Sequence, residues 1–289
     1  CSSDLEVLLT ASSNNNQRYG IEIRDNISTL KLDSTGAGTK ANLIETNANS
    51  NNDGYSFGNN KTPSFEITGS HDLTIMAKAG VDLSNGANSS LAGFSETVNV
   101  DASSFTGVLR IAGSDSSDGD VITGGSNADI FYGKNGADTL TGNAGADQFR
   151  LTGHNNQIDT IKDFTQGEDK VGLNQFDFGN TTATQDGATL STSDYVENRD
   201  GITNIGSADD KKVIELQKSL SSDQIANDSG AAIDAFVLVL NTSTNKAELW
   251  YDNDWSTASS RDQVITFDNI VDLTGVQSFS NADFVEYTF

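Results

Sequence analysis

The chain has 289 residues, of which 41 are acidic and 17 basic, and its formal net charge is −24. Such a charge repels nucleic acids and anionic lipid surfaces, so no nucleic-acid partner is expected. The single cysteine, Cys1, excludes an internal disulfide, and no stretch approaches the roughly 20 consecutive apolar residues of a membrane-spanning helix.

Residues 1–100 are rich in Asn, Ser and Thr and contain short runs of alternating apolar residues. Such alternation predicts strands with one buried face. The runs are Tyr19/Ile21/Ile23, Leu30/Leu32, Phe65/Ile67, Leu73/Ile75, Val81/Leu83 and Val98/Val100. A further run, Leu109/Ile111, follows residue 100. Their irregular spacing fits either a β-sandwich or an irregular parallel solenoid. The Asn-rich tract 47–60 is expected to be a loop.

Residues 115–150 repeat with a period of nine. Each copy has an aspartate at its sixth position and an apolar residue at its eighth, and position four is Gly or another residue that suits a turn. The copies start at Asp115, Gly124, Gly133 and Gly142, their aspartates are Asp120, Asp129, Asp138 and Asp147, and their apolar residues are Ile122, Phe131, Leu140 and Phe149. A turn-rich loop would not keep both features in register through four copies.

The period predicts a parallel β-roll. Six turn residues precede a three-residue strand with one inward side chain, and two nonapeptides form one coil. Turns on the same side then stack about 4.8 Å apart and align rows of oxygen atoms, which suit Ca²⁺. The expected ligands are carboxylates and backbone carbonyls of Asp118, Asp120, Gly124, Asn127, Asp129, Gly133, Gly136, Asp138, Gly142, Gly145 and Asp147. At least two ions are expected, one pairing Asp120 with Asp138 and one pairing Asp129 with Asp147.

The repeat resembles the RTX, or haemolysin-type, calcium-binding nonapeptide G-G-x-G-x-D-apolar-x. The resemblance implies a roll that folds only when metal binds. Asn127 replaces Gly at position four and is expected to tolerate left-handed geometry. Asp115 and Ser116 replace two glycines, and a worn fifth copy from Leu151 to Asp159 has Ile158 at the apolar place.

Two flanking segments resemble parts of known exported proteins. The segment from Thr97 to Leu109 is similar to the Val-Asp-Ala-Ser stretch that precedes calcium repeats in some bacterial surface-layer proteins. The segment from Asp159 to Leu173 resembles the one that closes RTX rolls, which implies Ile161 and Phe164 as an apolar plug and Val171 with Leu173 in the next strand. There Asp159, Asp163 and Asp169 are either ligands of a terminal Ca²⁺ or surface carboxylates.

Residues 174–289 are predicted to form a third, β-rich region. Expected strands cover 213–216, 235–240, 249–251, 264–267 and 284–289, and a short helix is expected near 222–227. Three segments, 248–254, 270–276 and 282–285, resemble the C-terminal domain of type I secretion substrates. Trp255 stands where a glycine is usual, which weakens a calcium loop at Asp252 and Asp254. At the end Val285, Tyr287 and Phe289 share one strand face, and the resemblance implies that the exporter recognises this apolar terminus.

Catalytic motifs are not recognisable. His71 and His154 belong to no H-E-x-x-H pair, and no G-x-S-x-G elbow or phosphate loop occurs. We expect His154 to cap the worn fifth turn. The chain is therefore predicted not to be an enzyme. It shows no recognisable signal peptide, which is typical of a fragment or of export by a route that needs none.

Together the patterns predict an all-β protein with a parallel β-roll of calcium-binding nonapeptides between β-rich regions. The predicted regions are 1–100, solenoid-like; 101–173, the roll with its closing segment; and 174–289, the secretion region. The resemblances imply a secreted, calcium-dependent surface-layer module. Its partners would be further copies in a lattice, a type I exporter and, through other parts of the chain, outer-membrane lipopolysaccharide. The alternative is the folding and secretion module of a larger RTX adhesin or exoenzyme.

Overall fold

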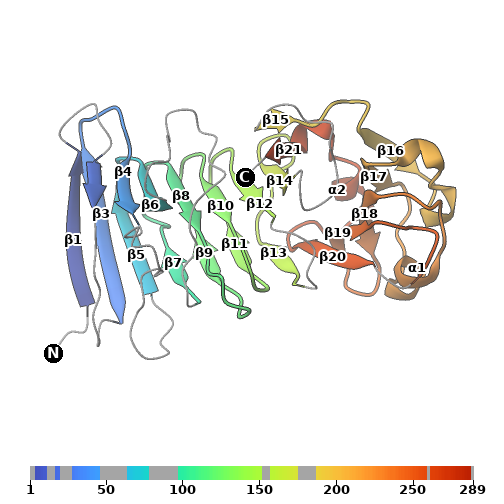
Figure 1. Cartoon of the computed structure of the whole chain (residues 1–289), viewed down its shortest axis with the longest axis horizontal. Helices are drawn as coiled ribbons and strands as arrows, with labels where there is room; N and C mark the ends of the chain where they lie inside the picture. Colours follow the sequence, from blue (N-terminus) through green and yellow to red (C-terminus); the bar gives the residue numbers. More distant parts are fainter. Residues whose placement is uncertain are drawn as a thin grey trace, which may run out of the picture. The chain divides into compact units, whose positions relative to one another are not determined.

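The computed structural model describes residues 4–11, 17–19, 28–45, 64–77, 97–151, 157–174, 187–258 and 261–287. The chain forms two compact units, which comprise Cys1–Arg150 and Leu151–Thr288. Both are built mainly of β-strands, so the predicted all-β class is confirmed (Figure 1). In the described part of the chain, every helix is too short or too polar to cross a membrane.

The first unit is a parallel solenoid whose strands alternate between two sheets (Figure 1). One sheet contains β1 (Asp4–Ala11), β3 (Thr29–Gly36), β5 (Ser64–Gly69), β7 (Asn99–Asp101), β9 (Val121–Thr123) and β11 (Thr139–Thr141). The other contains β2 (Gln17–Tyr19), β4 (Asn42–Glu45), β6 (Leu73–Ala77), β8 (Leu109–Ala112), β10 (Ile130–Tyr132) and β12 (Gln148–Arg150). Of the two predicted architectures, the solenoid is therefore the one observed.

The length of a coil varies in the first part of the unit and then shortens to two nonapeptides. Ser64 pairs with Asn99 of the next coil, and Asn99 pairs with Val121 after a shorter interval. Val121 then pairs with Thr139, which stands at the same position of the repeat two copies later. This confirms that two nine-residue repeats form one turn of the roll.

The inward side chains of the repeats form the core of the roll. Ile122, Phe131, Leu140 and Phe149 are 0–1% exposed, as their shared eighth position predicts. The rings of Phe131 and Phe149 lie 5.5 Å apart on successive coils of one sheet. The same column continues into the earlier coils, because Phe131 pairs with Ile111 and Ile111 with Ile75.

The predicted boundary at residue 100 lies within a continuous parallel ladder. β5 pairs with β7 and β7 with β9, so the strand-rich region and the repeats share one stack of coils. The three-region division remains a prediction. The predicted strands at Ile21 and Val81 and the predicted loop 47–60 lie outside the described residues.

The second unit combines a mixed sheet with a smaller one. The larger sheet has the order β13 (Asp159–Ile161), β20 (Asp262–Phe267), β19 (Lys246–Asp252), β18 (Ala235–Asn241), β17 (Lys212–Leu216) and β16 (Tyr195–Arg199). The smaller has β14 (Lys170–Asn174), β21 (Phe284–Tyr287) and β15 (Ala188–Thr189). Short helices are α1 (Ser222–Asn227), α2 (Leu273–Val276), η2 (Ile202–Asn204), η3 (Ser207–Asp209) and η4 (Asn281–Asp283).

The predicted strands and the predicted helix of the second unit are observed among the described residues. The helix near 222–227 exists, and a capping box between Ser221 and Gln224 fixes its start. In β21, Val285 and Tyr287 are buried on the face that they share, and Phe284 and Glu286 are buried on the other. The strand is an interior one, because it lies between β14 and β15 in its sheet. Phe289 lies outside the described residues.

Candidate metal centre

The nonapeptide turns lie on two edges of the roll. On the first edge, residues 113–120 lead into β9 and residues 133–138 into β11. On the second edge, residues 124–129 lead into β10 and residues 142–147 into β12. Turns of alternate nonapeptides therefore stack on the same edge, as a coil of two nonapeptides requires.

The four predicted aspartates stack as two columns. Asp138 Oδ1 accepts a 2.8 Å hydrogen bond from the backbone N–H of Asp120. Asp147 Oδ1 accepts the equivalent 2.8 Å bond from the N–H of Asp129. The structure thus brings together the two pairs that the sequence predicts, Asp120 with Asp138 and Asp129 with Asp147.

Each column also contacts the preceding coil, where Val98 and Leu109 stand in place of an aspartate. Asp120 Oδ1 accepts from the N–H of Val98 at 2.7 Å, and Asp129 Oδ1 accepts from the N–H of Leu109 at 2.8 Å. In each case the backbone N–H of one coil donates to the aspartate carboxylate of the next coil along the chain, where a regular ladder would offer a backbone carbonyl. This position explains why the repeat needs an aspartate immediately before each short strand.

Burial makes these carboxylates costly to ionise. All four aspartates are at most 1% exposed. Burial raises the pKa of Asp129 to about 6, although the backbone N–H groups of Leu109 and Gly125 and the charge of Arg110 lower it. Burial also raises the pKa of Asp120. A buried carboxylate gains stability from a nearby cation, so the columns favour a positive ion beside them.

Carboxylate and carbonyl oxygens of successive coils converge at the glycines that precede the turns. A Cβ on Gly124 would lie 2.5 Å from Asp129 Oδ2 and 2.9 Å from the carbonyl oxygen of Gly142. On the first edge, a Cβ on Gly113 would collide with Asp120 Oδ2 and the carbonyl oxygen of Gly133. A carboxylate oxygen and a carbonyl oxygen meet at each of these two places, and oxygen donors of this kind suit Ca²⁺. The same carboxylate oxygens also accept backbone N–H groups, Asp129 Oδ2 from Gly125 and Asp120 Oδ2 from Ser114.

The remaining predicted ligands lie on the same edges. Gly136 is beside the carbonyl of Asp118, and Gly145 is beside the carbonyl of Asn127, in each case one coil earlier on the same edge. Gly136 has a φ of 119° and Gly145 a φ of 134°. These backbone conformations suit glycine because it lacks a Cβ.

One prediction about the turns is wrong. Asn127 does not adopt a positive φ; the non-glycine residues of the roll that do so are Lys134 (73°) and Asn143 (69°), both at position two. The Asn127 side chain instead donates through Nδ2 to the carbonyl of Thr106 in the coil beneath. This contact holds the turn without left-handed backbone at position four.

Asparagine side chains also link the coils, and the sequence analysis missed this role. Asn135 Nδ2 donates to the carbonyl of Asp115 at 3.1 Å, and Asn143 Nδ2 donates to the carbonyl of Gly124 at 2.7 Å. Lys134 Nζ lies 3.2 Å from Asp115 Oδ1. These contacts could have been sought in the sequence, because each side chain follows its partner by slightly more than two nonapeptides. That spacing places the two residues on neighbouring coils of the same edge.

The worn fifth copy differs from its prediction in register, whereas the closing segment buries Ile161, Val171 and Leu173 as predicted. Ile158 is 38% exposed, whereas Asp159 and Ile161 are buried. The fifth copy therefore does not place Ile158 inward, because β13 starts at Asp159 and its alternation points residues 159 and 161 inward. Phe164 is buried as predicted and packs against Phe267 and Phe279. His154 lies outside the described residues.

A terminal calcium site in this segment remains a prediction. Asp169 Oδ2 accepts from the N–H of Thr165 at 2.8 Å, so this carboxylate caps a turn. Asp159 is 7% exposed, and Asp163 is partly exposed. No group of three or more His, Cys, Asp or Glu side chains suited to a metal ion occurs among the described residues. The sites on the roll would accordingly take most of their ligands from backbone carbonyls.

Trp255 fills the place of the missing glycine and changes the role of Asp252. The indole is fully buried and donates to the carbonyl of Ala235 at 3.0 Å. Asp252 Oδ2 lies 3.5 Å from Arg261 Nε, and the Arg261 guanidinium lies 4.7 Å from the Trp255 ring centre. Arginine thus takes the position of a counter-ion at Asp252.

The comparisons with known proteins agree with this geometry. Residues 114–158 match the family of RTX calcium-binding nonapeptide repeats, in four copies. No curated protein matches the chain. Proteins with such repeats are typically secreted, and the family is typically structural and calcium-binding rather than catalytic. The nonapeptides of this chain are therefore RTX calcium-binding repeats, and their ligand is Ca²⁺.

Proposed function

We propose that this chain is a calcium-dependent structural module of an exported surface-layer protein. The observation that carries the proposal is the pair of buried aspartate columns, Asp120 with Asp138 and Asp129 with Asp147, on opposite edges of one roll. A catalytic site is not needed to explain them. Their chemistry is that of a metal-dependent scaffold.

The ligands of each ion come from two coils of the same edge. Asp120 and Asp138 hold one ion with carbonyls such as that of Gly133, and Asp129 and Asp147 hold the other with carbonyls such as that of Gly142. When bound, Ca²⁺ supplies positive charge and accepts six to eight oxygens. The aspartates then keep their charge while buried, and adjacent coils become linked through their turns.

Folding of the roll is coupled to this binding. Each nonapeptide contributes one buried apolar side chain at its eighth position. Ordering its backbone costs about 1–2 kcal/mol per residue, which one such side chain does not offset. The roll thus stays unfolded where calcium is scarce, as in a cytoplasm, and can pass through an exporter. Outside, a site binding at about 10⁻⁴–10⁻³ M fills at millimolar calcium.

Self-association follows from the same change in charge. The chain carries a net charge of −24, which opposes the approach of a second copy. Bound calcium lowers that charge and orders the coils. In this proposal residues 174–289 serve export by a type I system, the strand-rich coils before residue 100 supply contacts between copies, and other parts of the chain bind outer-membrane lipopolysaccharide.

Calcium titration followed by analytical ultracentrifugation and electron microscopy tests the proposal. We expect ordered assemblies of the parent at millimolar calcium. Asp129→Ser combined with Asp138→Ser removes one carboxylate from each edge and should abolish assembly. The control, Asp200→Ser with Asp223→Ser, removes the same charge from exposed positions of the second unit and should assemble like the parent.

Two results would contradict the surface-layer function. One is a parent that folds its roll in calcium but remains monomeric, which would favour a folding and secretion module of a larger adhesin or exoenzyme. The other is assembly of the variant with Asp129→Ser and Asp138→Ser to the same extent as the parent.

A further inference from the structure

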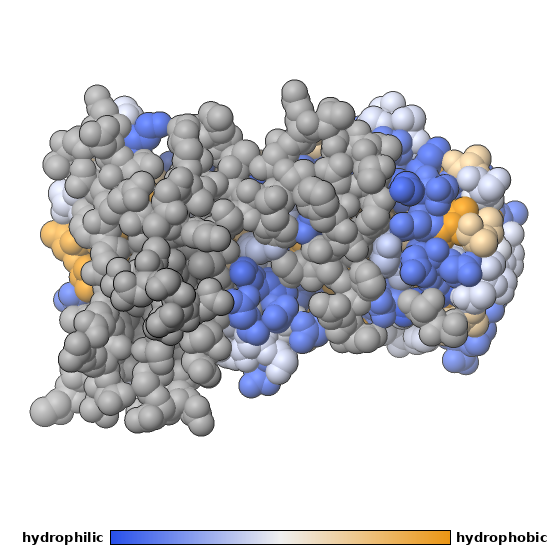
Figure 2. All heavy atoms as spheres, in the orientation of Figure 1, coloured by the Kyte–Doolittle hydropathy of each residue, from blue (hydrophilic) through white to orange (hydrophobic). Residues whose placement is uncertain are grey.

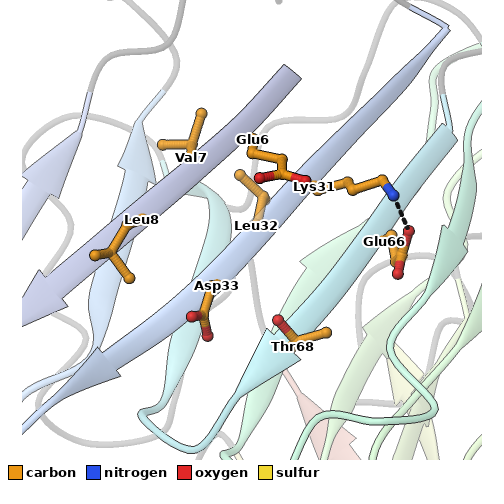
Figure 3. Close-up of a pocket in the computed structure, with 8 residues that line it drawn as sticks. All are labelled: Glu6, Val7, Leu8, Lys31, Leu32, Asp33, Glu66 and Thr68. Carbon is orange, nitrogen blue, oxygen red and sulfur yellow. Dashed lines mark ion pairs between the residues drawn. The ribbon is translucent and has the colours of Figure 1, made fainter. Parts of the chain in front are cut away.

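The charged side chains of this protein differ in their access to water. The pair of Lys31 with Glu66 is of the solvated kind, because Nζ lies 3.3 Å from Oε2 but the two side chains are 37% and 50% exposed (Figure 3). Figure 2 shows further hydrophilic side chains on the surface of the second unit. Arg261, immediately before β20, is different, because its side chain is only 2% exposed. A charge buried to this extent needs partners within the protein.

Backbone carbonyls surround the Arg261 guanidinium. Its Nη1 donates to the carbonyl of Ile225, and its Nη2 donates to those of Asp228 and, at 3.2 Å, Trp255. Ile225 lies in α1, and Asp228 is the C-cap residue of that helix. The last turn of α1 contains no basic residue. Arg261 therefore supplies, from a distant part of the chain, the cation that the carbonyl end of a helix favours.

A carboxylate and an aromatic ring complete the surroundings of the guanidinium. Arg261 Nε lies 3.5 Å from Asp252 Oδ2, and Cζ lies 4.7 Å from the centre of the Trp255 ring, within the range of a cation–π contact. Both partners are themselves held in place. The indole donates to the carbonyl of Ala235 at 3.0 Å, and Asp252 Oδ1 accepts from the N–H of Asp254 at 2.9 Å. The partners thus form a built site.

The arrangement of these partners suits a planar cation. The guanidinium carries its N–H donors in one plane, so it can reach several carbonyls while its face rests on an indole. Among the described residues, the oxygens that contact Arg261 come from three carbonyls and one carboxylate group. That set is smaller than the six to eight oxygens that Ca²⁺ takes. A lysine ammonium is compact and has no flat face to stack on the ring.

We propose that Asp252, the Trp255 indole and the carbonyls of Ile225, Asp228 and Trp255 form a binding site for a guanidinium group, which Arg261 fills as a built-in cation. The filled site is a latch that joins the start of β20 to the end of α1 and to the loop after β19. That loop is therefore closed by a side chain and not by a metal ion. The proposal does not depend on surface-layer assembly.

Removal of the Arg261 side chain should open the latch. Arg261→Ala should lower the urea midpoint of the second unit by about 1–2 M, because the buried Asp252 loses the charge of its arginine. The chain has two tryptophans, Trp250 and Trp255, and both belong to the second unit. Their fluorescence in urea therefore measures the unfolding of this unit in the full chain.

Free guanidinium at millimolar concentration, far below denaturing levels, is the probe for the emptied site. It should restore at least half of the lost midpoint of Arg261→Ala in a saturable manner, with and without calcium, whereas sodium chloride of equal ionic strength should not. The matched control is Arg199→Ala. Arg199 Nη2 lies 2.5 Å from the buried Asp209, but the arginine side chain is 37% exposed. Its removal leaves no enclosed site, so guanidinium should not restore this variant.

Three results would overturn the proposal. Guanidinium could fail to restore Arg261→Ala, it could restore Arg199→Ala equally well, or calcium could restore Arg261→Ala where guanidinium does not. The last result would assign a metal site to this loop.

Arg261→Lys provides a test that remains available if Arg261→Ala does not fold. The substitution keeps the positive charge but loses the plane of donors, so the urea midpoint should fall well below that of the parent. Arg199→Lys, at a solvent-exposed pair, should change the midpoint little. A parent-like midpoint for Arg261→Lys would show that the site needs only a charge, and the guanidinium site would be wrong.

Discussion

The roll and the second unit neutralise buried carboxylates in different ways. In the second unit, two buried carboxylates have arginine partners. Arg199 Nη2 lies 2.5 Å from Asp209 Oδ1, and Arg261 Nε lies 3.5 Å from Asp252 Oδ2. In the roll, backbone N–H groups are the main donors to Asp120 and Asp129, and burial still raises the pKa of both. The difference teaches that the sequence supplies counter-charges for these two carboxylates of the second unit, whereas other buried carboxylates there, such as Glu215, and the aspartates of the roll have neutral donors. In the roll the missing counter-charge would come from solution as Ca²⁺.

The two regions also differ in apolar burial. All seven residues of β18 in the second unit are buried, and Trp255 packs in the same core. By contrast, the strands of the roll are only three residues long: β9 and β11 each bury one residue, and β10 and β12 each bury two. The second unit therefore has the larger apolar core, whereas the roll has a narrow apolar column and would depend more on calcium at its turns.

Calcium removal should produce the largest contrast. We expect hydrogen exchange in chelator to show loss of protection through residues 115–160, with protection of β17–β20 retained. The reason is that carboxylate repulsion and backbone entropy then act without a compensating cation. Equal protection of the roll with and without chelator would remove the distinction between the two regions.

Trp255→Ala should reverse the contrast. The substitution empties a fully buried site and should destabilise the second unit by about 3–5 kcal/mol. The calcium concentration at which the roll folds should stay the same. Denaturant unfolding with separate probes in each unit measures both quantities, and a large change in the calcium midpoint would show that the regions are coupled.

The metal-free roll should become more stable, not less, as the pH falls from about 7 to about 4. The pKa of Asp129 in the folded, metal-free roll is about 6, above the ordinary value of about 3.9. The folded state thus binds more protons between these values, so Asp129 disfavours the metal-free fold at pH 7 by roughly 2–3 kcal/mol, and this cost disappears as the pH falls below about 4. Protons also compete with calcium, so the calcium midpoint should rise as the pH falls through 6. Calorimetric titrations at pH 7.5 and 5.5 with equal midpoints would contradict this.

A smaller effect is expected from a pair of glycines with similar backbone. Gly145 has a φ of 134° and Gly201 a φ of 129°. A Cβ on Gly145 would lie 2.5 Å from the carbonyl of Asn127, whereas nothing lies within 4 Å of a Cβ on Gly201. Gly145→Ala should weaken the roll by about 1–3 kcal/mol and raise the calcium midpoint. Gly201→Ala should affect only the second unit, and equal midpoints for the two variants would show that the close approach at Gly145 is unimportant.

The periodic parts of this chain were predictable from sequence because each position has one function. The aspartates at position six and the apolar residues at position eight occupy the places that the nine-residue period assigns, and α1 follows its capping box. β1 was missed because Leu8 interrupts the alternation of Val7 and Leu9. The outward place of Ile158 was missed because strand β13 sets a new register.

Other features depend on contacts between distant residues. The Asn143 amide reaches the carbonyl of Gly124 in the previous coil, across an interval that only the observed coil length defines. Trp255 indicated the loss of a calcium loop, but its partner Arg261 could not be identified from spacing. Sequence periodicity thus defines the columns of the roll, whereas side chains that connect columns or strands require the three-dimensional register.

The most direct test of calcium binding in the roll is anomalous diffraction from crystals grown with calcium. The account predicts an ion within about 2.3–2.6 Å of the Asp120 and Asp138 carboxylates and a second at the same distance from those of Asp129 and Asp147. Crystals that show an ordered roll with no anomalous peak at either pair would contradict it.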